Sequence, residues 1–152
     1  MTTNTLKINI PEGFEVSSFD KSSCEITLKE KPKNVTERIK SVADVLADHG
    51  LSQDEFDEQC DDLEADEVAY RILKMLAKSL NEGWVPNCND SNEYKYVAWF
   101  YMGGSSGFRS FGYSNWRSTS DVGSRLCYKT RELAEHAGKN FTEVYKQFMV
   151  IN

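Results

Sequence analysis

Residues that carry enzyme chemistry are sparse in this sequence. The only two histidines are His49 and His136, which lie 87 positions apart. A hydrolytic site needs a nucleophile, a base and a group that orients the base, and the residues flanking the two histidines do not form such a set. A Cys127–His136 pair likewise has no local signature of a cysteine hydrolase. We therefore expect no catalytic residue and no enzymatic activity.

The soft metal ligands are too dispersed to indicate a metal centre. Zinc sites use closely spaced pairs of cysteine or histidine, whereas the four cysteines contain no CxxC pair: Cys24, Cys60, Cys88 and Cys127. We expect all four to be reduced thiols. The acidic run 54–58 lacks the pattern of a calcium loop, and no Gly-Lys-Ser/Thr follows the glycine-rich segment 103–107 to make a phosphate loop. The sequence therefore predicts neither a metal nor a cofactor.

A segment rich in aromatic and basic residues is the strongest indication of a binding surface. Nine aromatic side chains occur in the 23 residues from Tyr94 to Trp116, and strand alternation divides them between two faces. The predicted surface consists of Trp99, Tyr101, Phe108, Arg109, Trp116 and Arg117. Rings beside arginines are typical of proteins that stack single-stranded nucleic acid. Aromatic residues also dominate protein–protein interfaces, which favours a protein partner or self-association.

The exposure of these rings separates the two hypotheses. Exposed Trp and Tyr side chains surrounded by arginine would indicate nucleic acid. Rings buried under the chain's own helices would leave only the interaction-protein hypothesis.

Charge is distributed unevenly along the chain, whose formal net charge is −6. Segment 44–67 holds eleven acidic residues and no Lys or Arg, whereas segment 94–131 holds six basic residues and one acidic residue. The acidic segment is either a solvated helix face or a surface that imitates the phosphate charge of nucleic acid toward a basic partner. The first interpretation is favoured, because acidic helix faces are common on globular proteins.

The elements that position these residues follow from hydrophobic periodicity. Period-two alternation and aromatic runs predict strands near 6–10, 24–28, 94–102, 108–113 and 124–128. Helical periodicity predicts helices within 35–46, 52–60, 66–82 and 131–149, and Ser52 with Glu55 fits a capping box. The order ββααα βββ α predicts an α+β fold, with a mostly antiparallel sheet of about five strands and helices packed on one face. The length predicts a single domain, 1–152.

Hydropathy predicts a soluble, cytoplasmic protein with no membrane association. The longest apolar stretch, 97–102, has six residues, against about 20 for a membrane-spanning helix. Residues 1–5 lack the basic and apolar regions of a secretory leader.

Several segments resemble a family of small uncharacterised proteins from anaerobic gut bacteria and their phages and mobile elements. The more specific ones are Gly-Trp-Val-Pro at 83–86 and Gly-Ser-Arg-Leu-Cys at 123–127, accompanied by 10–15, 94–96 and 134–141. Cys88 stands where the family pattern has tryptophan, and segment 30–65 carries no resemblance. The resemblance implies a mobile-element context and brings no assigned activity or site.

The sequence therefore predicts a non-enzymatic binding or interaction protein of phage or prophage origin. One alternative is single-stranded nucleic-acid binding through the aromatic–basic hairpin at about 94–117. The other alternative is a virion or assembly component.

Overall fold

The computed structural model describes residues 7–30, 34–103, 107–120 and 122–151. The chain has an α+β fold, with 40% helix and 21% strand. It divides into two compact units, residues 1–34 and 35–152, which are described separately here. The predicted five-stranded sheet is wrong, because the strands form two separate two-stranded antiparallel hairpins. The single-domain assignment stays a prediction.

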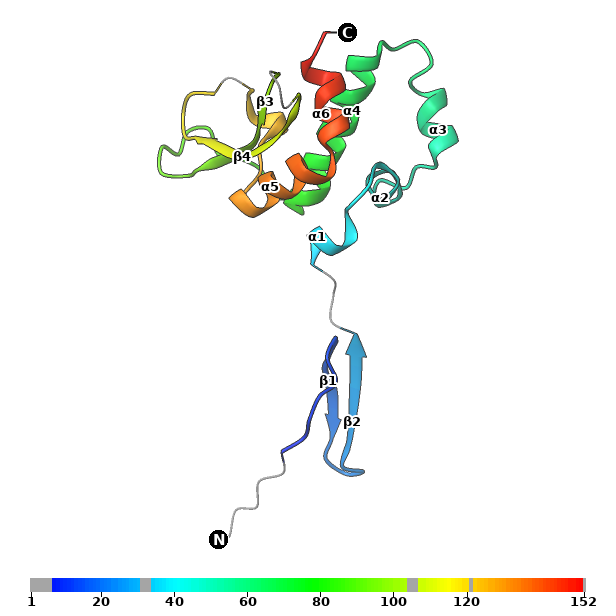
Figure 1. The fold of residues 1–152 in the computed structure, drawn as a ribbon. Coiled ribbons are helices and arrows are strands. Elements are labelled where there is room, and N and C mark those ends of the chain that lie inside the picture. The colour runs from blue at the N-terminus through cyan, green and yellow to red at the C-terminus, as the bar shows by residue number, and fades with distance from the viewer. Residues whose placement is uncertain (1–6, 31–33, 104–106, 121, 152) are drawn as a thin grey trace. The chain divides into compact units, whose positions relative to one another are not determined.

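The first unit contains one hairpin, formed by β1 (Phe14–Asp20) and β2 (Glu25–Glu30) (Figure 1). The predicted strand near 6–10 is wrong: residue 6 lies outside the described part, and residues 7–10 belong to no strand. The Phe14 amide donates a 3.2 Å hydrogen bond to the Pro11 carbonyl, so the chain turns before the pairing begins. Residue 17 is an extra residue in β1, between the pairs formed by Val16 and Ser18. This bulge hides the strand's alternation in the sequence.

The second unit begins with four helices: α1 (Val35–Arg38), α2 (Val42–Asp48), α3 (Gln53–Glu58) and α4 (Ala65–Asn81). The predicted helix near 66–82 is confirmed as α4, and the predicted capping box of Ser52 and Glu55 begins α3. The apolar stripe at 35–46 belongs to two short helices, because Ser41 caps a new helix with a box of its own to Asp44.

A second hairpin follows, made of β3 (Lys95–Tyr101) and β4 (Arg109–Trp116). These strands confirm the pair predicted near 94–102 and 108–113, and residues 104–106 of the predicted turn lie outside the described part. The strand predicted near 124–128 is wrong. Residues 124–126 form a 3-10 turn, and Tyr128 alone pairs with Tyr96 in an isolated bridge. The Tyr128 amide donates to the Tyr96 carbonyl at 2.7 Å.

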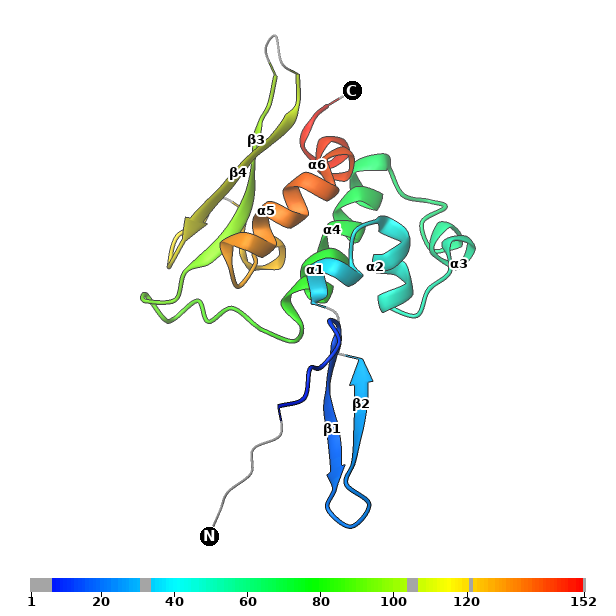
Figure 2. The same cartoon turned by 60° about the horizontal axis from the view of Figure 1, so that its bottom comes forward.

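The chain ends with α5 (Arg131–Asn140) and α6 (Thr142–Met149), where one helix over 131–149 is predicted. The break occurs at Phe141, whose backbone leaves helical geometry at φ −119° and ψ 27° while its ring is buried. Helix α5 packs against both strands of the second hairpin, and α6 packs along α4 (Figures 1 and 2). The break therefore allows the apolar stripe of 131–149 to pack in two places: α5 packs against the hairpin and α6 packs against α4. Among the described helices, none is long and apolar enough to cross a membrane.

Candidate binding surface

One face of the β3–β4 hairpin is closed by α5. Ala98 and Phe100 on β3 point to this helix together with Ser110 on β4, and they meet it at Gly138. A Cβ placed on Gly138 would lie 3.0 Å from Ser110 Oγ and 3.3 Å from Ala98 Cβ. The absence of a side chain at Gly138 therefore lets helix and hairpin approach closely.

The opposite side carries exposed aromatic side chains. Trp99 and Tyr101 alternate with the buried Ala98 and Phe100 and remain 45% and 39% exposed. Phe111, the extra residue at the hairpin's register shift, is 58% exposed, and its ring meets that of Tyr101 edge-on at 4.3 Å between centroids. We call this side the outer hairpin face: Trp99, Tyr101, Arg109, Phe111 and Trp116. Trp99, Tyr101 and Phe111 make an exposed aromatic platform on this face, whereas Trp116 is half-buried.

Two arginines of the predicted surface lie over tyrosine rings of the hairpin region. The Arg109 guanidinium lies 4.2 Å from the centroid of the Tyr101 ring. The Arg117 guanidinium lies 4.4 Å from the Tyr94 ring centroid and donates to the Tyr94 hydroxyl. Stacking fixes the plane of a guanidinium and leaves its edge free to donate hydrogen bonds. No Asp or Glu occurs between Tyr94 and Ser120 to neutralise these cations.

Lys95, a third cation of the segment, is fully buried and does not belong to the surface. Its ammonium donates to the carbonyls of Asn87, Asp90 and Glu93 at 2.6, 3.1 and 3.0 Å. It also lies 3.2 Å from the Glu93 carboxylate. Its role is to hold the loop that precedes β3. The positive charge that the hairpin offers to a ligand therefore comes from its arginines.

A hollow of about 280 Å³ opens between β3, β4 and the loop after β4. Trp99, Trp116, Val97 and Val122 are among the residues that line it. The other lining residues are polar: Ser114, Asn115, Thr119 and Ser120. Aromatic planes combined with short polar side chains suit a flat, polar ring, because such a ring can stack and hydrogen-bond at once.

The structure divides the predicted surface residues into three groups. Trp99, Tyr101 and Arg109 lie together on the outer hairpin face, and Trp116 and Arg117 lie at its other end, where Trp116 pairs with Lys95. Phe108 lies on the opposite side: it is half-buried and stacks on Phe100 with centroids 5.0 Å apart. Phe111 belongs to the surface although the sequence does not single it out. No sequence signal marks it, because the register shift that sets its position depends on pairing.

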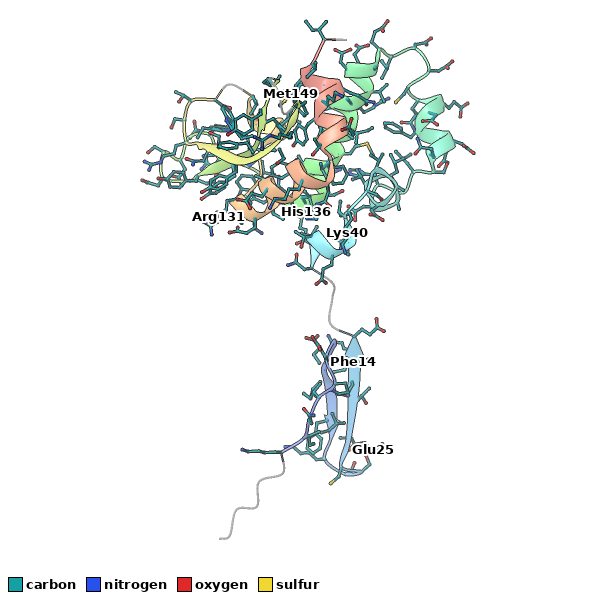
Figure 3. The ribbon with its side chains drawn as sticks, viewed as in Figure 1. Phe14, Glu25, Lys40, Arg131, His136 and Met149 are labelled. Carbon is teal, nitrogen blue, oxygen red and sulfur yellow. The ribbon has the colours of Figure 1, made fainter. Side chains whose placement is uncertain are left out.

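Both histidines contact backbone carbonyls of segments distant in the sequence. His49 Nε2 lies 3.1 Å from the Met75 carbonyl of α4, and His136 Nε2 lies 2.6 Å from the Ile39 carbonyl (Figure 3 labels His136).

Cys60 and Cys127 are buried, Cys24 and Cys88 are exposed, and burial raises the pKa of the Cys127 thiol to about 11. In the described ranges, no group of three metal-ligating side chains gathers.

The acidic segment lies across the unit from the hairpin. Helices α2 and α3 lie on one side of α4, and β3 and β4 lie on the other (Figure 2). Three of the acids, Asp44, Glu55 and Glu67, accept hydrogen bonds from the backbone that begins α2, α3 and α4. These side chains serve to start helices.

The chain matches no protein-family model, no curated protein and no solved structure. What its surface can bind therefore follows from the residues themselves.

Proposed function

We propose that this protein is a non-enzymatic binding module and that its outer hairpin face binds single-stranded nucleic acid. The observation that supports this proposal most directly is that Trp99 and Tyr101 are exposed to solvent while Arg109 stacks on the Tyr101 ring. This arrangement supports a base-stacking surface over rings packed under helices. Every nucleobase offers a flat face to such rings, so the binding would be tolerant of sequence.

Local electrostatics supports this ligand class despite the net charge of −6. The hairpin presents Arg109 and Arg117 with no acid between Tyr94 and Ser120, and charges farther away than about 10 Å are screened at ordinary salt. The hollow beside Trp99 would take one unstacked base, whose edge Ser114 can hydrogen-bond. With two arginines on the hairpin, the affinity would be modest and would fall with salt.

Fluorescence anisotropy with labelled DNA and RNA oligonucleotides of about 15 residues tests this proposal, a length that covers one binding site. We expect Trp99→Ala and Arg109→Ala each to weaken binding by about 5- to 150-fold, which corresponds to the loss of about 1–3 kcal/mol per stacked base. Lys78→Ala removes an exposed cation from α4 and is the matched control. Duplex DNA should bind less well, because its bases are not free to stack. Absence of binding at low salt would exclude nucleic acid.

A protein partner is the second proposal for the same face. Phe111 and Met102 are 58% and 54% exposed, and aromatic, Met and Arg side chains are all enriched in protein interfaces. A virion or assembly role would be one case of it, and the proposed phage or mobile-element context rests on sequence resemblance alone. If oligonucleotides fail to bind, pull-downs from the native host with wild type and Phe111→Ser distinguish a partner that uses this face.

A further inference from the structure

The hairpin of the first unit sorts its side chains by chemistry onto two faces. Residues that pair directly across two strands share a face. One face is polar, with the pairs Glu15–Lys29, Ser18–Thr27 and Asp20–Glu25. The other carries Val16–Leu28 and Phe19–Ile26, with Phe14–Glu30 at the open end. We call the latter the apolar hairpin face: Phe14, Val16, Phe19, Ile26 and Leu28.

The bulge at residue 17 preserves this apolar face. Val16 and Phe19 are three positions apart, so an uninterrupted strand would place them on opposite faces. The extra residue restores Phe19 to the side of Val16, opposite Ile26. The inserted residue therefore keeps the large Phe19 ring on the apolar hairpin face.

In the part of the first unit that the structure describes, residues 7–30 and 34, the apolar hairpin face stays open to solvent. Val16 and Phe19 are 45% and 54% exposed. A two-stranded hairpin is marginally stable in water unless its apolar face packs on something. A sheet with one apolar and one polar face is the pattern of a sheet covered on one side.

We propose that a second copy of the chain covers this face, so that two hairpins pack face to face around a two-fold axis. Charge complementarity selects this occupant. Glu30 is the one charged residue among the pairs on the apolar face and lies at the open end, whereas the exposed Lys21 lies at the turn end. The Asp20–Glu25 pair beside this turn lies on the polar face, away from the interface. Antiparallel packing brings each Glu30 to the partner hairpin's turn end, where Lys21 lies, and keeps the two Glu30 side chains apart.

The same operation matches the apolar side chains. The central pair Val16–Leu28 would pack on its own symmetry mate, and Phe14 would meet Phe19 of the other copy. Paired sheets of this kind lie about 10 Å apart and cross at about 30°. A face that is complementary to itself in this way forms a closed dimer instead of an open chain.

Matched substitutions on the two faces test the dimer. Val16→Glu places a charge on the apolar hairpin face, whereas Ser18→Glu places the same charge on the polar face of the same strand. The mass of the full-length protein is measured by sedimentation equilibrium over a range of concentrations. We expect wild type and Ser18→Glu to form dimers that dissociate on dilution, and Val16→Glu to remain monomeric. Circular dichroism checks that the described helices, which belong to the other unit, stay folded.

A charge exchange at exposed positions tests the orientation without disturbing the hairpin. Lys21→Glu should weaken the dimer by roughly two- to thirtyfold at low salt, the size of the two surface ion pairs that a two-fold dimer contains, and adding Glu30→Lys should restore it. A wild type that stays monomeric at every concentration overturns the proposal, as does a dimer that persists in Val16→Glu. The proposal does not rest on the nucleic-acid hypothesis, since it concerns a different unit.

Discussion

The hydroxyl groups of Tyr128 and Tyr145 lie 2.9 Å apart in the core of the second unit, and both side chains are almost completely buried. Tyr128 belongs to the bridge with β3, and Tyr145 lies on α6. Their hydrogen bond therefore links the sheet to the last helix. Burial raises the pKa of both hydroxyls well above the ordinary tyrosine value.

The tyrosine pair should make the fold sensitive to alkali. An unfolded tyrosine has a pKa of about 10, and the pKa of each folded hydroxyl is higher, so the folded state holds its protons more tightly. The contribution to stability is complete below pH 10 and falls as the pH rises above it. We expect the free energy of unfolding, measured in urea between about pH 8 and pH 11, to fall more steeply for wild type than for the Tyr128→Phe, Tyr145→Phe double variant. Parallel slopes would contradict this.

Gly138→Ala should destabilise the second unit although alanine favours helices by about 1 kcal/mol over glycine. The new Cβ would press on Ser110 Oγ and on Ala98 Cβ, which is fixed to the strand backbone. We expect a net loss of about 1–3 kcal/mol, typical of overpacking, in a urea denaturation curve. Ala98→Gly in the same chain should recover part of it. A Gly138→Ala variant that is more stable than wild type would mean that Ser110 and Ala98 move aside at little cost.

Lys95→Met should loosen the loop at 87–93. The three carbonyls that accept from the ammonium would lose their donor, and each buried polar group left unpaired costs about 1–3 kcal/mol. Hydrogen exchange followed by mass spectrometry should show faster exchange in this loop and in β3. Lys78→Met, an exposed control on α4, should leave both unchanged. If Lys95→Met binds oligonucleotides like wild type, the ammonium plays no direct part in ligand binding.

Acid should loosen α2 and α3 before the rest of the second unit. Backbone hydrogen bonds from Lys40 and Ser52 lower the pKa of Asp44 and Glu55, respectively. The stability from these carboxylates is present above the unfolded pKa of about 4 and disappears as the pH falls below it. We expect hydrogen exchange near pH 3 to rise first in these helices, ahead of α4. Ser41→Ala should reproduce the effect on α2 at neutral pH, with a loss of about 1 kcal/mol. Uniform exchange across the unit would contradict it.

The elements that the sequence predicts well are those set by neighbouring residues. Helix α4 and the capping box of Ser52 and Glu55 depend on residues within one or two turns, and the β3–β4 hairpin on two strong runs joined by a short turn. The sequence does not predict strand β1, because residue 17 interrupts its alternation of apolar and polar side chains. The prediction of a single sheet is wrong because the pairing of strands is decided by contacts between residues distant in the sequence.

Prediction of the binding surface from the sequence is limited in the same way. Alternation places Trp99 and Tyr101 together, since they are two residues apart on one strand. The position of Phe111 depends on a register shift, and the burial of Lys95 depends on a loop folding over its ammonium. Sequence identifies which residue types are present, and pairing and loop closure decide which of them reach solvent.

If the outer hairpin face binds nucleic acid as proposed, the placement of the acidic helices across α4 from the arginine-bearing hairpin has a kinetic consequence. A unit that is negative on one side and positive on the other experiences a torque in the field of a polyanion and turns before contact. Steering of this kind raises the fraction of encounters that begin with the correct side and is lost at high salt. The acidic helices would thus act on association rate and orientation without touching the ligand.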